Sequence, residues 1–208
     1  MDGVFMRKII RFFTFLFVLA LVLEFFGIAE DKQNLRNSLI RLHVVAASDS
    51  RQDQEVKLQV RDAVIAYVEG ALEHVMTIEE AKAWLQENLP GIQSAANDVL
   101  GKLGLSDTAQ VTLAPEAFPE RNYDTFSLPS GVYQSLRVTI GAGEGKNWWC
   151  VVFPNLCLPA AGESTEDVAA GAGFSDELTD TLTQKEGYQL RFYFLDVLGK
   201  IENFFFGK

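Results

Sequence analysis

Two cysteines separated by a turn are the residues of this chain best suited to covalent chemistry. Cys150 and Cys157 flank Pro154 and Asn155, a pair that is typical of turns. A fully extended segment would hold the two Cα atoms about 23 Å apart, whereas a disulfide needs about 5.5 Å. The chain must therefore fold back on itself if the cysteines pair. The alternative is two reduced cysteines that behave as small buried hydrophobic residues.

A second group of reactive side chains lies within nine residues of sequence. Arg41 and His43 stand in an expected strand, and Asp49 follows it in a turn of the form Ser-Asp-Ser. Histidine changes its charge near an unperturbed pKa of about 6.5, so this group could form a contact surface or a switch. The alternative is a structural role, in which a hydrogen-bonded histidine and polar turn residues hold the backbone.

An enzymatic hypothesis combines the two groups. Cys150, His43 and Asp49 could form a cysteine-hydrolase triad, because such triads are defined by geometry and not by order in the sequence. Two observations speak against it: a disulfide to Cys157 would consume the nucleophile, and no family-type nucleophile signature surrounds Cys150. We therefore expect no catalytic site. No metal is expected, because the cysteines and the two distant histidines lack closely spaced ligand pairs.

Two further pairs of residues are candidates for binding a partner. Trp148 and Trp149 are adjacent, so in a strand they point to opposite faces of the sheet. One of them should join the core, and the other could anchor a partner, because tryptophan is enriched in binding hot spots. Arg61 and Asp62 lie on an expected helix, where Lys57 shares a face with Arg61. That face could equally be an ordinary solvated surface.

A basic flank precedes a long apolar run at the N-terminus. The run from Phe12 to Leu23 and the small residues Gly27 and Ala29 match a secretory signal that is cleaved after Ala29. The apolar run would span about 18 Å as a helix, or about 27 Å if it continued to Ala29, so an uncleaved membrane anchor is the alternative. Both hypotheses export residues 31–208, because the positive flank stays in the cytoplasm. The flank consists of Arg7, Lys8 and Arg11.

Residues 30–208 are enough for one exported domain with its own core. The chain has a net charge of −10, which makes nucleic acid and anionic lipid head groups poor partners. Export also favours the disulfide between Cys150 and Cys157, since disulfides persist in oxidising compartments. No cofactor is expected, because the glycines at 141–145 follow a strand without opening the helix that a dinucleotide fingerprint requires.

Hydrophobic periodicity predicts an α+β fold. The mostly antiparallel sheet should be accompanied by about three to four helices, and an apolar helix should precede the domain. Residues 133–140 and 147–153 are expected to pair as an antiparallel hairpin. Residues 159–186 are small and acidic, and they predict a flexible loop. The expected strands are 39–47, 109–114, 123–128, 133–140, 147–153 and 189–194. The expected helices are 52–76, 77–89, 92–103 and a helical segment after Phe194. The helix at 77–89 should begin at a Thr77 capping box and end before Pro90-Gly91.

Two blocks of sequence resemble the stage II sporulation protein R family of endospore-forming bacteria. The first, residues 39–64, contains the Arg-x-His strand and the Ser-Asp-Ser turn, and the second, residues 128–157, contains the tryptophan pair and the two cysteines around a proline. Two positions depart from the family pattern. Ala47 stands where the family usually has Asn, which puts a polar role there in doubt. Asn155 replaces a second proline, which loosens the turn between the cysteines.

The resemblance implies a signalling role and not an enzymatic one. Proteins of this family are similar to messengers that the forespore exports into the space between the two septal membranes. There they would stimulate the membrane-bound aspartic-type protease of the mother cell, which processes the precursor of sigma-E. The resemblance implies no catalytic residues. A passive envelope-associated domain that binds through an exposed tryptophan stays as a third hypothesis.

Overall fold

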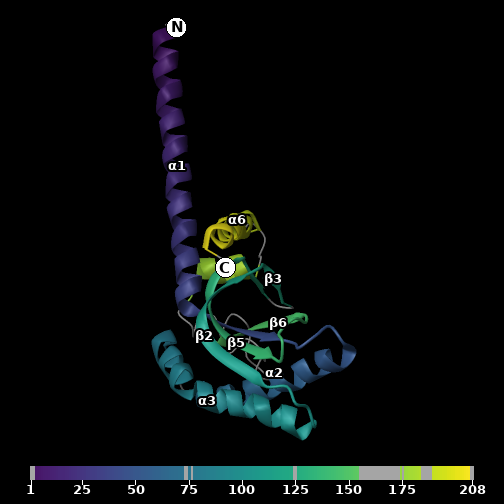
Figure 1. The fold of residues 1–208 in the computed structure, drawn as a ribbon. Helices are drawn as coiled ribbons and strands as arrows, with labels where there is room; N and C mark the ends of the chain where they lie inside the picture. The colour runs from purple at the N-terminus through teal and green to yellow at the C-terminus, as the bar shows by residue number, and fades with distance from the viewer. Residues whose placement is uncertain are drawn as a thin grey trace.

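The computed structural model describes residues 3–72, 75, 77–123, 126–154, 174, 176–183 and 189–206. It has an α+β fold preceded by a long apolar helix, as predicted (Figure 1). The helices are α1 (Gly3–Ser38), α2 (Arg51–Leu72), α3 (Ile78–Lys102), α5 (Asp176–Leu182) and α6 (Gln189–Phe206), and the strands are β1 (Ile40–Val45), β2 (Ala109–Phe118), β3 (Arg121–Asn122), β4 (Ser127–Leu128), β5 (Gly131–Ile140) and β6 (Asn147–Phe153).

The main sheet has the strand order β2-β5-β1-β6, and it is mixed but mostly antiparallel. β1 lies in the middle, parallel to β5 and antiparallel to β6, and all six of its residues are buried. The predicted hairpin of residues 133–140 with 147–153 is therefore wrong. A buried strand needs partners on both edges for its backbone groups, and the link between β5 and β6 passes the end of β1, where Gly145 N donates to Ala46 O.

Helices α2 and α3 cover one face of the sheet (Figure 1). The predicted break at Pro90-Gly91 is wrong, because α3 runs through it with Pro90 inside the helix. Leu85 and Ile92 are buried on either side of Pro90, and such packing outweighs a local propensity to break. The predicted cap is confirmed, since the Thr77 hydroxyl accepts a hydrogen bond from Glu80 N at 3.3 Å.

A second hydrophobic cluster lies on the other face of the sheet. It joins Leu35 at the end of α1 to Phe118 and Tyr133 of the sheet and to Leu178 of α5. The small hairpin of β3 and β4 also belongs to this side, with Leu128 buried.

Four predicted elements differ from the structure on this side of the molecule. In place of the single strand predicted at 123–128, the structure has the two short paired strands β3 and β4. The strand predicted at 109–114 extends to Phe118, because β2 is an edge strand, where Pro115 is tolerated. Residues 189–194 are helical and not a strand, because α6 packs Phe192 and Leu195 at helical spacing. Part of the loop predicted at 159–186 is helix α5; residues 159–173, 175 and 184–186 lie outside the described residues.

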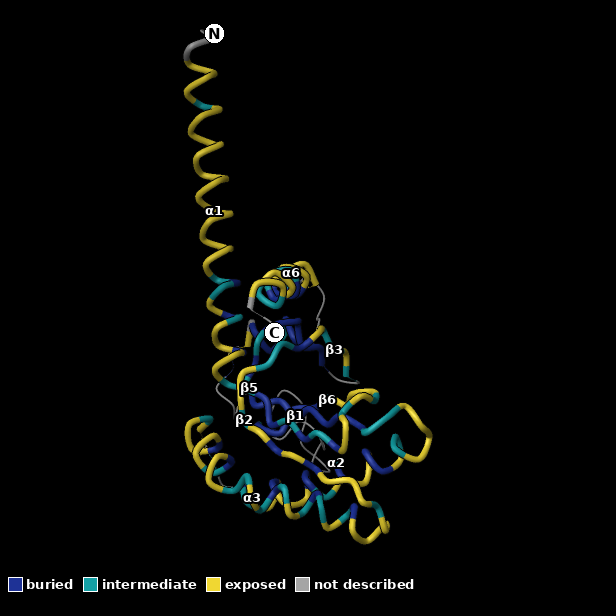
Figure 2. The backbone as a smooth tube through the Cα atoms, in the orientation of Figure 1, coloured by how far each residue is buried: buried dark blue, intermediate teal, exposed yellow. Residues whose placement is uncertain are grey.

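Helix α1 has two parts with different surroundings. Its N-terminal part, from Phe5 to Phe26, projects away from the domain with its apolar side chains exposed (Figure 2). Its last turns are docked on the domain, with Ile28, Asp31 and Leu35 buried. Among the described residues, α1 is the helix long and apolar enough to cross a membrane.

Candidate functional site

The sheet separates the predicted site residues into two groups. Arg41 and His43 point to the face that carries the second hydrophobic cluster, where their exposed fractions are 0% and 6%. They are therefore not an accessible contact surface in this conformation. Arg61, Asp62 and Trp148 lie on the opposite side, around a pocket between α2 and β6.

His43 lies at the centre of a polar network in the sheet. Its Nδ1 is 2.9 Å from Glu116 Oε1, and its Nε2 is 3.0 Å from Asn147 Oδ1. Each ring nitrogen therefore has a hydrogen-bond partner, and the tautomer decides which of the two nitrogens donates. The ring also stacks on Trp149, with centroids 5.5 Å apart. A structural role for His43, the alternative to a contact surface or switch, explains all of these contacts.

Glu116 links His43 to a second cation. The same Oε1 atom accepts a hydrogen bond from Arg137 Nη1 at 2.8 Å. Burial alone would raise the pKa of Glu116, but the hydrogen bond to His43 and the charges of His43 and Arg137 outweigh it and hold this pKa below its usual value. The carboxylate therefore stays ionised at neutral pH.

Among the described residues, Arg41 is a buried cation without a carboxylate partner. Its Nη2 donates to Tyr123 Oη at 3.2 Å, whereas Nε and Nη1 have no hydrogen-bond partner in the described part of the chain. The guanidinium lies 4.1 Å from the ring centroid of Phe118 and 5.0 Å from that of Tyr133. Aromatic faces attract a cation, but they do not replace hydrogen bonds, so the described residues leave the Arg41 guanidinium partly unsatisfied.

Asp49 has a different role from the other two members of the predicted cluster. Its carboxylate accepts a hydrogen bond from Lys146 N at 2.7 Å, and Lys57 Nζ donates to Lys146 O at 3.0 Å. Burial lowers the pKa of Lys57, and the nearby Asp49 partly offsets that effect. These contacts tie the turn after β1 to the link between β5 and β6. The interpretation of the Lys57 and Arg61 face as solvated is wrong, because this lysine is buried.

The alternative hypothesis of a hydrolase triad is not supported by the geometry. In the register of β1 with β6, Cys150 pairs with Leu42, and His43 pairs with Trp149. Side chains alternate along a strand, so Cys150 packs in the cluster beneath α2 and α3 while His43 points to the other face. Asp49 is engaged by the backbone of Lys146. The enzymatic hypothesis based on these three residues is therefore contradicted.

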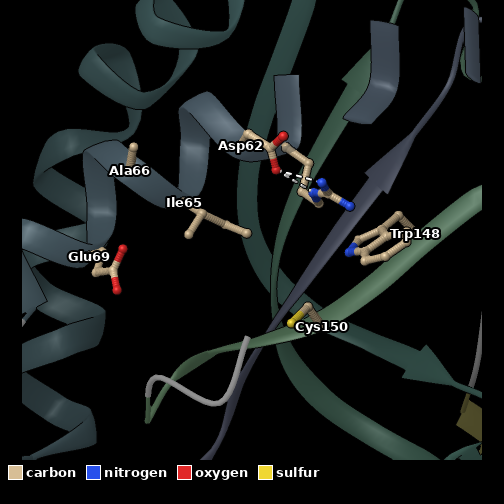
Figure 3. A pocket seen from close by; sticks show the side chains of 7 residues that line it. Asp62, Ile65, Ala66, Glu69, Trp148 and Cys150 are labelled. Atoms are coloured by element: carbon tan, nitrogen blue, oxygen red, sulfur yellow. Dashed lines mark hydrogen bonds and ion pairs between the residues drawn. The ribbon is translucent and has the colours of Figure 1, made fainter. Parts of the chain in front are cut away.

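The pocket between α2 and β6 has a volume of about 410 Å³. Trp148 and Cys150 of β6 line it opposite Asp62 and Ile65 of α2 (Figure 3). The Arg61 guanidinium lies 4.4 Å from the Trp148 ring centroid. Arg61 is also paired with Asp62 across 2.6 Å. The remaining lining residues are Ala66 and Glu69.

The two tryptophans point to opposite faces of the sheet, as their adjacency predicts. Trp148 is 37% exposed at the pocket, whereas Trp149 packs between the His43 ring and the Arg121 guanidinium, which is 3.8 Å from its ring centroid. Trp148 is therefore the tryptophan that a partner could reach. Among the described residues no free cysteine is present. Cys157 lies outside them, and its pairing with Cys150 stays a prediction.

The sequence interpretation missed several residues of these networks. Glu116 was missed because the predicted strand ended before Pro115, whereas β2 continues to Phe118. Ser130 was assigned to a turn, but its N and Oγ lie 2.9 Å and 2.6 Å from Asp196 Oδ1, so it holds helix α6. The contacts of Glu116 with His43 and of Ser130 with Asp196 join residues far apart in sequence, and no local pattern predicts them.

Comparison with known proteins covers most of the residues described above. The family model described as stage II sporulation protein R (spore_II_R) matches residues 36–163. A protein of Bacillus subtilis (strain 168) with the name Stage II sporulation protein R is 34% identical over 151 residues, which cover 70% of this chain and 67% of that protein. No solved structure matches the chain. The matched region contains the sheet, helices α2 and α3, and the pocket. On this evidence, the chain belongs to the stage II sporulation protein R family.

Proposed function

We propose that this chain is an exported, non-catalytic signalling protein of sporulation. It acts from the space between the septal membranes, where it stimulates the membrane-bound aspartic-type protease that processes the sigma-E precursor in the mother cell. The observation that carries the proposal is membership of the sporulation family over residues 36–163. The apolar helix α1, which fits an export signal or an anchor, supports export.

The pocket between α2 and β6 is the surface we assign to the protease. Trp148 and Arg61 are residue types enriched in binding hot spots, and here they stack on each other at the rim of a concavity. The side chain of Asp62 is 64% exposed and can add a charged contact. A stimulating protein must bind the active state of its target better than the resting state, and a pocket with an aromatic anchor and charges can provide that difference.

Reconstitution tests the signalling proposal. The full chain is added to membranes that carry the protease and the sigma precursor, and the cleaved product is measured against membranes without the chain. We expect processing only when the chain is present. Equal processing in both samples would instead support the passive envelope-associated domain.

Substitutions at the pocket test the assigned surface. Trp148→Ala and Asp62→Arg should reduce processing at least tenfold, equivalent to about 1.4 kcal/mol of lost binding, while the thermal melts stay near wild type. Glu87→Arg on α3 is the matched control, because it reverses another exposed acidic residue that does not line the pocket. A loss of processing in the control as large as that in Asp62→Arg would refute the assignment.

A further inference from the structure

Helix α6 turns most of its polar side chains toward the protein, although Lys200 is exposed. Asp196 accepts hydrogen bonds from Ser130, Arg191 is paired with Asp31 across 2.7 Å, and Glu202 is paired with Lys32 across 2.8 Å. Asn203 Nδ2 donates to Phe118 O at 2.8 Å. Most polar side chains of this helix therefore contact the sheet, the turn before β5 or α1.

The opposite face of α6 is apolar and exposed. Six large side chains on it have exposed fractions between 50% and 82%. Their helical spacing places them on one face of the helix. None of the other described elements buries them. They are Leu190, Tyr193, Phe194, Ile201, Phe204 and Phe205. A helix with its polar face inward and its apolar face outward is the reverse of a helix on the surface of a water-soluble protein, and such exposed apolar patches mark interaction sites.

The position of α6 indicates what covers this face. Arg191 of α6 reaches both Glu24 and Asp31 of α1, at 4.0 Å and 2.7 Å. Glu24 follows the apolar run of α1, so α6 lies level with the end of the segment that could cross a membrane. Figure 1 shows α6 on the side of the domain from which α1 projects, crossing α1 instead of running along it. A bilayer entered by α1 would therefore meet the outward face of α6.

We infer that α6 is an interfacial membrane helix, with Leu190, Tyr193, Phe194, Ile201, Phe204 and Phe205 inserted at the boundary between head groups and acyl chains. Phenylalanine, leucine and tyrosine are typical of helices that lie in this boundary. The apolar side chains drive the association, because a chain with a net charge of −10 gains nothing from anionic head groups. The inference rests on an α1 that stays in the membrane as an anchor, one of the two forms of export that the proposed function allows, and it does not depend on the protease.

Photolabelling of the full chain tests the inference. The chain is reconstituted in vesicles of phosphatidylcholine and phosphatidylethanolamine that contain a lipid with a diazirine in its acyl chain, and labelled residues are mapped by mass spectrometry. We expect label on the apolar run of α1 and on Phe204 and its neighbours in α6. Leu103, which is 42% exposed at the end of α3, is the matched control and should carry severalfold less label. High salt should leave the pattern unchanged.

The outcomes separate this inference from the proposal about α1. Label on α1 with no more on α6 than on Leu103 would overturn the interfacial helix and leave the α1 proposal standing. Absence of label from both helices would overturn both. Phe194→Glu with Phe204→Glu should remove the α6 label while the α1 label and the thermal melt stay as in wild type. An unlabelled α6 that cross-links to a second copy would assign the face to a dimer and also overturn the inference.

Discussion

At the scale of single residues, His43 shows how burial changes the meaning of a motif. From the sequence, a polar triplet of Arg41, His43 and Asp49 could form a contact surface or a switch. The ring is instead buried and holds Glu116 and Asn147. The chemical type of these residues was predictable from sequence, but the face of the sheet to which they point was not.

The first prediction concerns the stability that His43 provides. His43→Ala leaves the partly buried Glu116 carboxylate without one of its donors, so the free energy of unfolding should fall by about 1–3 kcal/mol. Urea unfolding followed by circular dichroism measures this change. At a temperature where His43→Ala is folded, the variant should stimulate processing of the sigma precursor as wild type does. A folded variant that fails to stimulate processing would return His43 to a direct signalling role.

The second prediction concerns pH and Glu116. Its pKa is lower in the folded chain than its usual 4.5, so the unfolded chain binds the proton more readily. The interaction therefore stabilises the fold above about pH 4.5, and that stability is lost as the pH falls further and the folded carboxyl is protonated. Glu116→Gln should be less stable than wild type at pH 7 and should lose less stability between pH 5 and pH 3. Equal slopes in the two proteins would show that Glu116 does not contribute.

The third prediction concerns the two cysteines. If Cys150 and Cys157 form one bridge, Cys150→Ser and Cys157→Ser remove the same cross-link, and each should lower stability by about 2–3 kcal/mol. The double variant should be little worse than either single one, because the effects are not additive. Thiol titration of the purified chain should find no reactive thiol before reduction. Loss of function in Cys150→Ser alone would instead indicate a reactive thiol.

At the scale of elements, the segments whose periodicity is local were the predictable ones. The capped start of α3, the strands β5 and β6 and the helix α2 follow from the spacing of their own apolar residues. The errors occurred where distant packing decides. β1 lies between β5 and β6 because both of its edges must be paired, and α3 passes Pro90 because its flanks are buried on α2 and the sheet.

Gly91 and Gly199 illustrate contacts that no local pattern reveals. A Cβ at Gly91 would lie 2.1 Å from Tyr67 Oη, and one at Gly199 would lie 1.5 Å from Ser130 O. Helix α3 thus approaches α2 closely at one glycine, and α6 approaches the turn before β5 at the other. Ser130 belongs to a block that resembles the family, so part of that block serves to dock α6.

The fourth prediction concerns this docking. Gly199→Ala forces α6 away from the backbone of Ser130 and should lower the free energy of unfolding by about 1–3 kcal/mol, as overpacking does. Gly101→Ala is the matched control, because a Cβ there meets nothing within 4 Å; it should be neutral or stabilising by up to about 1 kcal/mol. Urea unfolding compares the two. Similar losses in both variants would contradict the close contact of α6.

At the scale of the whole molecule, the fifth prediction concerns export. The basic flank of α1 should keep the N-terminus in the cytoplasm and place the domain outside. An enzyme that works only when exported, fused after Lys208, should therefore be active. A cytoplasmic reporter fused at the same position should be inactive. The reverse pattern would contradict the topology on which the signalling proposal depends.

Because the end of α1 is buried, cleavage after Ala29 competes in time with folding of the domain. Ile28 is buried and Asp31 is paired with Arg191, so the predicted cut lies inside a regular helix that is docked on the domain. Peptidases cut chain that is locally opened, which the folded domain opposes here. Cleavage would therefore have to precede folding, and a domain that folds first would keep its anchor permanently. The order in which the two events occur would decide whether the messenger diffuses or stays at the membrane that released it.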